Sequence, residues 1–575
     1  MERNVSRFIQ RHALQKLTFL VVAILTSLII CYRYQIINQF SVLFGDDYDT
    51  VIEISILHHW KNVFFNGETW SSTQYFFPYL KTLGYNDGYF LFGILYSISQ
   101  FFTKSPFISN DVTGIFLHVI GFCLFYIMCR TVFRFQFISS IFGSFIFVTS
   151  NNIWINSAHH IQILMIYFIP ALIILFYISR ENYISGNRKR SYLYALCCSA
   201  LCAACFMTGY YILWFFVFSI CILLATVSTI SCIRGNIKSV FNAEINLYPY
   251  YFILLSSFIT LMVPFLYVYL SKARETGMHS WEETYAYLPH PYDLLHIGHW
   301  NGGVIFAISV LNQLGQWGVG RDLVLRTPYH FSELLVGFPP VTLALAFWGA
   351  WAGTRYGTAR YSRTIWLIFS VTNIIILLLC FKLGPLSLWQ LVFHLVPGAK
   401  GLRVVSRFFL YETLPLCIAL SLACDFLLQR RQYVLTTVLL LIVVCEQVNF
   451  SPVLGLSLNR EQALYDSVPD KPAQCKAFVV ADTPPAVPDS GYDLYHGNSF
   501  AMLYSELAQI PTPMGFSTFN PPDWDFSSPY DGVPGVTDIA VRAVHYASAH
   551  NFLPGLCELS ITKNTASWRN LRSIP

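Results

Sequence analysis

The sequence KLTFLVVAILTSLIICYRY at residues 16–34 is followed closely by GDDYDTVIEISILHHW at residues 45–60, and together they indicate the class of protein. The first stretch is an apolar run of membrane-span length, and the second is acidic. Four basic residues precede the apolar run, namely Arg3, Arg7, Arg11 and Lys16. A cleavable signal peptide has a similar shape, but Arg-Tyr-Gln at 33–35 stands where small residues would mark a cleavage site. We therefore expect a retained first span with a cytoplasmic N-terminus.

The composition of the whole chain agrees with this expectation. Of 575 residues, 55% are hydrophobic, 17% aromatic and only 12% charged, where soluble proteins carry about 25% charged residues. The mean hydropathy is +0.50. These values exclude a disordered chain and argue against a soluble enzyme. The net charge of +5 is small and gives no indication of a nucleic-acid partner.

Ten further apolar runs follow the first, so about eleven membrane spans are expected. They lie near 112–130, 136–150, 162–179, 192–207, 211–232, 250–270, 334–352, 364–381, 406–428 and 432–449. Basic residues cluster in alternate turns, around 130–134, 180–190, 234–238, 355–363 and 430–431, and the positive-inside rule assigns these turns to the cytoplasm. The run at 89–102 is too short for a span, and we expect it to be a helix at the outer interface. The C-terminus is then extracytoplasmic.

This topology leaves three large outer segments. Two of them, 33–111 and 271–333, are loops of a transmembrane domain at 1–450, and the third is a C-terminal domain at 451–575. The tail is rich in Pro, Asp, Ser and Tyr, with short apolar runs, which predicts a small extracytoplasmic α+β domain. Thirteen of the fifteen cysteines precede residue 452; the other two, Cys475 and Cys557, could form a disulfide there.

The first outer loop carries the strongest candidates for chemistry, Asp46, Asp47 and Asp49. A helix over 49–65 would place an apolar stripe along the membrane surface and its acidic start near the first span. Carboxylates in that position could act as a general base or hold a divalent cation. The alternative is a solvated loop whose aspartate caps a helix.

Other polar residues of the outer side are weaker candidates for binding substrate. His159 and His160 precede a span, where one of them could hydrogen-bond a phosphate or sugar or merely end the helix. Asp87 lies in GYNDGYF, which also fits a simple turn. Glu282 belongs to a loop rich in His, Asp and aromatic residues, a composition typical of carbohydrate sites, and its spacing matches no zinc motif.

Two arginines, Arg403 and Arg407, begin a late span on the outer side in GLRVVSRFF. Four residues apart on a helix, they would project to one side. Two guanidiniums at this interface could bind a lipid-linked phosphate, and the alternative is pairing with lipid headgroups in general.

Several motifs together resemble the bacterial GT-C superfamily of integral-membrane glycosyltransferases, which use polyprenyl-phosphate sugar donors. The residues that carry the resemblance are Gly45 to Asp49, Phe77-Pro78, His159-His160 with Pro170, and Leu402 to Phe408. The resemblance implies an all-α polytopic fold in the bacterial inner membrane. It also implies transfer of a sugar to a hydroxyl of a glycan, lipid or protein at the outer face, with inversion.

Site roles follow from the same resemblance. The catalytic base falls on Asp46 or Asp47, with Asp49 in support, and the donor phosphate on Arg403 and Arg407. No resident cofactor is expected, although a divalent cation is not excluded. The expected partners are a polyprenyl-phosphate-linked sugar, a glycan or lipid acceptor and membrane lipids.

Other classes of function remain as alternatives. A transporter or flippase would carry ionisable residues near the middle of its spans, whereas these spans are nearly free of charge. A non-catalytic assembly partner for cell-surface polysaccharide would need no acidic site. An oligosaccharide polymerase or ligase would lack the early acidic loop and place its key residues in a later loop.

Overall fold

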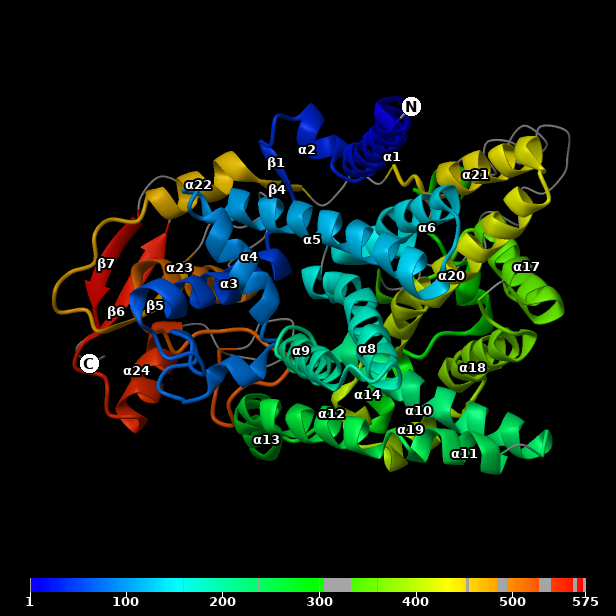
Figure 1. Ribbon diagram of the computed structural model, residues 1–575. Helices are drawn as coiled ribbons and strands as arrows, with labels where there is room; N and C mark the ends of the chain where they lie inside the picture. Colours follow the sequence, from blue (N-terminus) through cyan, green and yellow to red (C-terminus); the bar gives the residue numbers. More distant parts are fainter. Residues whose placement is uncertain are drawn as a thin grey trace, which may run out of the picture.

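The chain is a polytopic, mostly helical membrane protein (Figure 1). The computed structural model describes residues 2–158, 160–235, 237–298, 300–304, 332–358, 360–450, 455–482, 494–526, 539–561 and 566–571. Seven of the described helices are long and apolar enough to cross a membrane, and a bent pair makes an eighth.

All eleven segments expected to span the membrane are helical. The seven long spans comprise α1 (Glu2–Cys31), α5 (Pro106–Met128) with η2 (Cys129–Phe133), α6 (Phe137–Thr149) with α7 (Asn151–Ser157), η3 (Ile161–Phe168) with α8 (Ile169–Ile184), α10 (Tyr210–Ile233), α18 (Arg363–Cys380), and η7 (Val405–Arg407) with α20 (Phe408–Gln429). The bent pair is α12 (Tyr248–Leu261) and α13 (Val263–Thr276), which meet at 53°. The remaining three are α9 (Arg188–Phe206), α17 (Pro340–Tyr356) and α21 (Tyr433–Gln447). How many of the eleven cross the bilayer stays a prediction.

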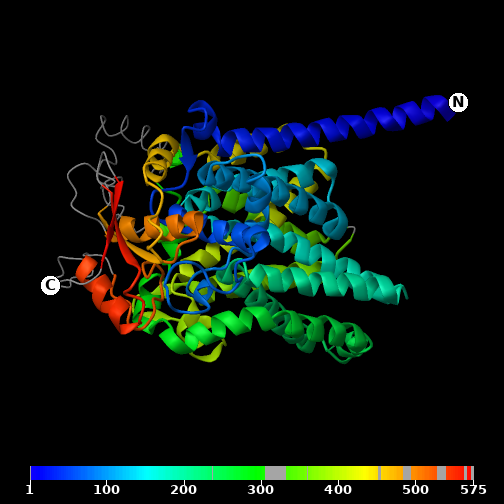
Figure 2. The ribbon, with the colours of Figure 1, turned by 90° about the vertical axis from the view of Figure 1, so that its left-hand side faces the viewer.

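The basic turns gather at one end of the helix bundle. Arg360 lies 3.7 Å from Glu181, which belongs to a different turn, and the Tyr361 hydroxyl donates to the Val132 carbonyl at 2.8 Å. Arg180 pairs with Glu244 in α11 (Ile237–Ile245) at 2.6 Å. In Figure 2 the start of α1 points away from the C-terminal strands, which lie at the opposite end of the bundle. The alternation deduced from Lys and Arg therefore agrees with the arrangement of the helices.

The first outer segment forms α2 (Arg33–Ile37), β1 (Val42–Phe44), α3 (Asp49–Asn66), η1 (Thr82–Tyr85) and α4 (Phe90–Ser99). The run at 89–102 contains the helix α4, whose place at the outer interface stays a prediction. Helix α3 differs from the prediction, because most of its side chains are buried instead of lying on an open membrane surface. It is covered by α4 and by α23 (Leu494–Ala508), a contact across more than 400 residues that no local pattern indicates.

The later outer segments are shorter and less regular. They comprise α14 (Trp281–Ala286), η4 (Pro291–Leu295), η5 (Ser332–Leu334), β2 (Lys382–Leu383), β3 (Leu386–Ser387), α19 (Trp389–Leu395) and η6 (Ala399–Gly401). Although η5 is only one turn long, it brings Glu333 beside the start of α20.

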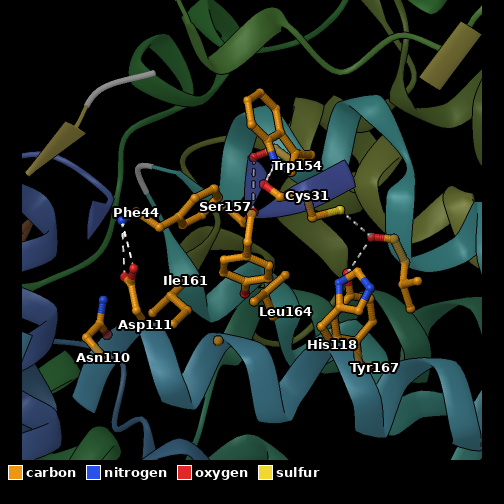
Figure 3. Close-up of a pocket in the computed structure, with 13 residues that line it drawn as sticks. Cys31, Phe44, Asn110, Asp111, His118, Trp154, Ser157, Ile161, Leu164 and Tyr167 are labelled. Atoms are coloured by element: carbon orange, nitrogen blue, oxygen red, sulfur yellow. Dashed lines mark hydrogen bonds between the residues drawn. The ribbon is translucent and has the colours of Figure 1, made fainter. Parts of the chain in front are cut away.

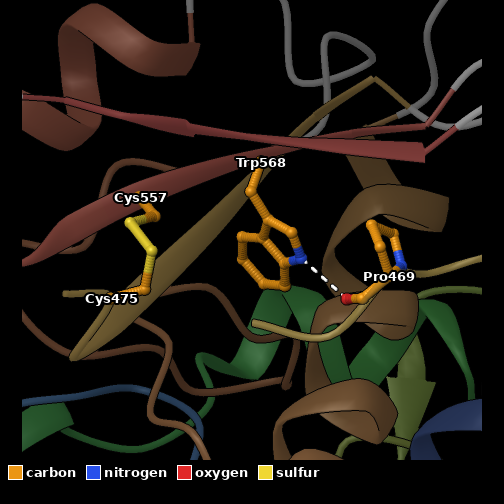
Figure 4. Close-up of a disulfide and its surroundings, with 4 residues drawn as sticks. All are labelled: Pro469, Cys475, Cys557 and Trp568. Carbon is orange, nitrogen blue, oxygen red and sulfur yellow. Dashed lines mark hydrogen bonds between the residues drawn. A yellow bond between two sulfur atoms is a disulfide. The ribbon is translucent and has the colours of Figure 1, made fainter. Parts of the chain in front are cut away.

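The C-terminal segment combines helices with a small sheet, as expected of an α+β tail. It comprises β4 (Gly455–Ser457), α22 (Leu458–Asp466), β5 (Ala477–Asp482), α23, α24 (Ile539–Ala549), β6 (Leu556–Ile561) and β7 (Ala566–Asn570). The sheet order is β5-β6-β7, parallel in the first pair and antiparallel in the second. The disulfide that Cys475 and Cys557 could form is present and joins the start of β5 to β6, as Figure 4 shows. A separate antiparallel pair, β1 with β4, ties this segment to the first outer loop.

Candidate functional site

The acidic loop is fixed in place by a buried aspartate of α5. Both carboxylate oxygens of Asp111 accept from the backbone N–H of Phe44, at 3.1 and 3.3 Å (Figure 3). This contact borders a cavity of about 30 Å³. The next residue, Gly45, has φ +119°, and a Cβ there would lie 2.2 Å from the Thr50 hydroxyl oxygen. The turn that leads into the three aspartates thus requires glycine.

Asp46 is turned back onto its own chain. Its Oδ1 accepts from the backbone N–H groups of Tyr48 and Thr50, both at 3.1 Å, while its own N–H donates to the Thr50 hydroxyl at 3.0 Å. A carboxylate that binds N–H groups at the start of a helix is a stabilising cap. The capping alternative considered from the sequence therefore describes what Asp46 does.

Asp47 faces the C-terminal segment. Its Oδ2 lies 3.3 Å from Arg460 Nη1 in α22 and 3.5 Å from His496 Nε2 in α23. Burial raises the pKa of Asp47, but the neighbouring His496 ring and the charge of Arg460 outweigh burial and lower the pKa below its usual value. A carboxylate with a lowered pKa, engaged by two basic groups, is a poor proton acceptor.

Asp49 leads into a chain of charged groups that the sequence predicts only in part. Its Oδ2 lies 3.9 Å from His160 Nδ1, and the other ring nitrogen of His160 lies 3.3 Å from Glu333 Oε1. Glu333 in turn accepts from Arg407 Nη2 at 2.7 Å and from Nε at 3.1 Å. The Asp49 side chain is 36% exposed, against 16% for Glu333 and 9% for Arg407. The chain of contacts therefore runs from a partly open carboxylate to a buried ion pair.

Glu333 is held ionised by this arrangement. Burial raises the pKa of Glu333, but the Arg407 guanidinium and the His160 ring outweigh burial and keep the pKa well below its usual range. No pattern around residue 333 distinguishes it in the sequence. Its place just before the outer start of a span is the only signal there, and Glu333 was not among the predicted site residues.

The two arginines do not share a helix face, which corrects the expectation drawn from their spacing. Residues 402–404 are irregular, and α20 begins only at Phe408 after the single turn η7. The Arg407 guanidinium is engaged by Glu333 and lies 5.3 Å from the Tyr211 ring centre. The half-buried Arg403 lies 5.3 Å from the Tyr287 ring centre and forms no ion pair with the described residues.

A second carboxylate of α3 supports the site from behind. Glu53, one turn beyond Asp49, is buried and accepts from the Tyr89 hydroxyl at 2.9 Å and from the Ile161 N–H at 3.0 Å. Burial raises the pKa of Glu53 well above its usual range, although the Tyr89 hydrogen bond acts against this. Glu53 thereby anchors the backbone that follows His160 and positions that ring.

Of the remaining candidate residues, Asp87 stabilises a helix, and Glu282 lies on the surface. Asp87 accepts from the Tyr210 N–H at 2.9 Å and caps α10, and burial raises its pKa while that N–H lowers it. Glu282 is exposed in the first turn of α14, and no contact joins it to the other described candidates. His159 lies outside the described residues.

A divalent cation at this site would draw on Asp49, His160 and Glu333, the residue types that bind such ions. The present contacts use both ring nitrogens of His160, one toward each carboxylate. A single ion can take only one of these nitrogens, so the imidazole would have to turn to serve it.

No protein-family model and no curated protein matches the chain in sequence. Among solved structures, it is similar to the Archaeoglobus fulgidus oligosaccharyltransferase tethered with an acceptor peptide, at 13% identity and a TM-score of 0.48, covering 95% of this chain and 69% of that one. It is also similar to the archaeal oligosaccharyltransferase AglB of the same organism, in complex with an inhibitory peptide and a dolichol-phosphate. The identity is 13% and the TM-score 0.48, and the match covers 98% of this chain and 75% of that one. For ArnT from Cupriavidus metallidurans the identity is 8% and the TM-score 0.35, and the match covers 94% of this chain and 92% of that one. A bacterial origin of the chain stays a prediction.

Proposed function

We propose that the chain is a membrane glycosyltransferase that moves a sugar from a polyprenyl-phosphate donor to a hydroxyl acceptor, with inversion. One observation carries the proposal: Asp49, His160, Glu333 and Arg407 form successive contacts of 3.9, 3.3 and 2.7 Å. A candidate base and a guanidinium from opposite ends of the sequence therefore belong to one site. The motif resemblance supplies the reaction class.

In this reaction Asp49 accepts the proton of the acceptor hydroxyl. The acceptor oxygen forms a bond to the anomeric carbon, and the bond from that carbon to the phosphate oxygen breaks. The phosphate leaves with the electron pair. Asp49 suits the role of base better than its neighbours, because Asp46 caps a helix and Asp47 is engaged by Arg460.

Arg403 is the proposed ligand of the departing phosphate. It is half-buried and free of ion pairs among the described residues, so its guanidinium can form charge-assisted hydrogen bonds to phosphate oxygens. Arg407 keeps its charge near the same place but is already bound to Glu333. Its proposed role is to hold Glu333 and, through Glu333, the His160 ring.

The proposed setting is the extracytoplasmic rim of a bacterial inner membrane, with the C-terminal segment at 451–575 as a covering domain. The location is supported by the basic turns, which lie at the far end of the bundle from β5 to β7 (Figure 2). A divalent cation bound near Asp49 would stabilise charge on the phosphate, in line with the ligand types present.

The direct test measures sugar transfer by the purified full chain with a panel of polyprenyl-phosphate sugars. We expect Asp49→Asn to lower the rate about 100-fold or more, the scale of a lost general base. Asp47→Asn is the matched control in the same loop. Its transfer rate should stay within about 10-fold of the wild-type rate, because Asp47 contacts the C-terminal segment and not the proposed substrates. Equal rates for wild type and Asp49→Asn would refute the assigned base.

One observation favours a transport function instead. Glu412 of α20 is buried inside a span, and its Oε1 has no hydrogen-bond partner among the described residues. Such a carboxyl is a default candidate for an ion or substrate path. The test measures lipid flipping in proteoliposomes. A flippase is favoured if the wild type flips lipid but transfers no sugar, and if Glu412→Gln abolishes the flipping.

A further inference from the structure

Three ligand-type side chains converge at the middle of α3, away from the charged chain that begins at Asp49. They are His59 of α3, Glu68 just beyond that helix, and Glu506 of α23. His59 Nδ1 lies 3.6 Å from Glu506 Oε1 and 3.8 Å from Glu68 Oε2, and the three atoms all lie within 4.8 Å of one another. The side chains of His59 and Glu506 are fully buried, and that of Glu68 is 13% exposed.

Two of the three facing atoms have no hydrogen-bond partner among the described residues, and the third, Glu506 Oε1, accepts from the Gln74 backbone N–H. The two unpartnered atoms are His59 Nδ1 and Glu68 Oε2, which are both buried and make no hydrogen bond within the described part of the chain. The separations of 3.6 and 3.8 Å are too long for the N–H···O bonds that a protonated His59 would form. Ligand atoms about 2.0–2.2 Å from a tetrahedral Zn²⁺ lie roughly 3.3–3.6 Å apart. The 3.6 Å separation lies at the top of this range and the 3.8 Å separation just above it, so a shared cation suits the spacing better than direct hydrogen bonds.

Further hydrogen bonds orient each of the three side chains. His59 Nε2 lies 3.2 Å from the Trp70 carbonyl oxygen, to which it donates, so Nδ1 is the ring nitrogen that faces the two carboxylates. Glu68 Oε1 accepts from the Gln74 side chain at 3.1 Å, and Glu506 Oε1 accepts from the Gln74 backbone N–H at 2.9 Å. Outer partners of this kind fix the orientation of metal ligands.

The charges also call for a cation. Glu506 Oε2 accepts from the Asn62 amide at 3.1 Å, a neutral donor that leaves the charge of the carboxylate in place. Two carboxylates within a few ångströms in a buried site repel each other unless a proton or a metal lies between them.

We propose that His59, Glu68 and Glu506 bind a Zn²⁺ ion, which joins the first outer segment to helix α23 of the C-terminal segment. An imidazole ligand favours Zn²⁺ over Ca²⁺ or Mg²⁺, which prefer oxygen ligands throughout. A water on the side of Glu68, the one partly exposed ligand, completes a tetrahedral set. The ion is structural: it lies about 15 Å along α3 from Asp49 and fixes the helix whose start carries the acidic loop.

The test measures bound zinc in the full chain. Wild type, Glu68→Gln, Glu506→Gln and the control Asp49→Asn are purified in detergent, stripped with chelator, equilibrated with micromolar Zn²⁺ and measured by mass spectrometry of the metal. Asp49→Asn is matched because it removes a carboxylate from the same helix at the other candidate cation site. X-ray absorption at the zinc edge of the wild type reports the ligands without any substitution.

We expect Glu68→Gln and Glu506→Gln each to lose one equivalent of zinc relative to wild type, and Asp49→Asn to keep that equivalent. The absorption spectrum should fit one imidazole with oxygen ligands. The proposal is overturned if the wild type binds no zinc. It is also overturned if Asp49→Asn loses zinc while Glu68→Gln and Glu506→Gln keep it. A spectrum without imidazole also overturns it, even where a glutamate variant fails to fold.

Discussion

The buried pair of Glu333 and Arg407 gives the sharpest prediction about stability. Their side chains are 16% and 9% exposed and share hydrogen bonds of 2.7 and 3.1 Å. Breaking a buried pair by removing one partner costs about 3–5 kcal/mol, because the other charge stays buried. Gln at 333 keeps one acceptor oxygen, so we expect Glu333→Gln to cost about 3 kcal/mol, at the lower end of that range.

A double-mutant cycle isolates the interaction. Arg407→Gln alone should cost a similar amount, and the double variant should cost less than the sum, with a coupling of about 2–3 kcal/mol. The assay is reversible unfolding of each variant in mixed micelles of a mild detergent and dodecyl sulfate. Arg360 and Glu181 provide the control pair, because they are 3.7 Å apart and more exposed, and their coupling should stay below about 1 kcal/mol. A coupling under about 0.5 kcal/mol for Glu333 and Arg407 would mean that the two charges do not depend on each other.

The same pair predicts a pH dependence with a definite sign. The folded-state pKa of Glu333 lies below its ordinary value of 4.5, so the ionised form is favoured by folding. Its contribution to stability is therefore complete above pH 4.5 and is lost as the pH falls from there toward the folded-state pKa. Lowering the pH from about 6 to about 3 should destabilise the wild type more than Glu333→Gln, as measured by unfolding at each pH. Parallel pH profiles would contradict this.

Three further outcomes are expected. Arg403→Ala should raise the KM for the lipid-phosphate donor by about 10–100-fold, the loss of one or two charged hydrogen bonds, and an unchanged KM would remove Arg403 from the donor site. Replacing both Cys475 and Cys557 by Ala should lower the free energy of unfolding by about 4–5 kcal/mol, because the bond closes a loop of 82 residues; a smaller effect in chemical unfolding would point to residual structure in the unfolded state. Gly45→Ala should slow sugar transfer and lower the unfolding midpoint, because φ is +119° and the methyl group meets Thr50; wild-type values for both would show that the turn tolerates a side chain.

Patterns that act over a short range were readable from the sequence. The eleven apolar runs are all helical, because a membrane span depends on local hydrophobicity and backbone hydrogen bonds that close within the helix. The two tail cysteines were recognisable as a possible pair because they are the only ones in the C-terminal segment, but whether they form a bond depends on the fold. The same local reasoning misjudged Arg403 and Arg407, since it assumed that the helix of α20 extended back over both residues.

Contacts between distant parts of the chain could not be predicted from the sequence. Glu333 follows His160 by 173 residues, and Glu506 follows His59 by 447, so neither pairing leaves a local periodicity. Burial of α3 was missed for the same reason. The apolar stripe of Ile52, Ile56 and Trp60 predicts one buried face, but not that α23 covers the other.

Helix α3 shows why the acidic loop depends on the C-terminal segment. On one side the loop is tied to the spans, through Asp111 and the Phe44 N–H. On the other side β1 pairs with β4, and Asn62 donates to the Glu506 carbonyl at 2.8 Å. The membrane-spanning part therefore holds the start of α3 in place, and the C-terminal segment holds the rest of the helix in place. Because Asp49 and His160 are already 3.9 Å apart, a small displacement of α3 would separate the candidate base from the charged groups that complete the site.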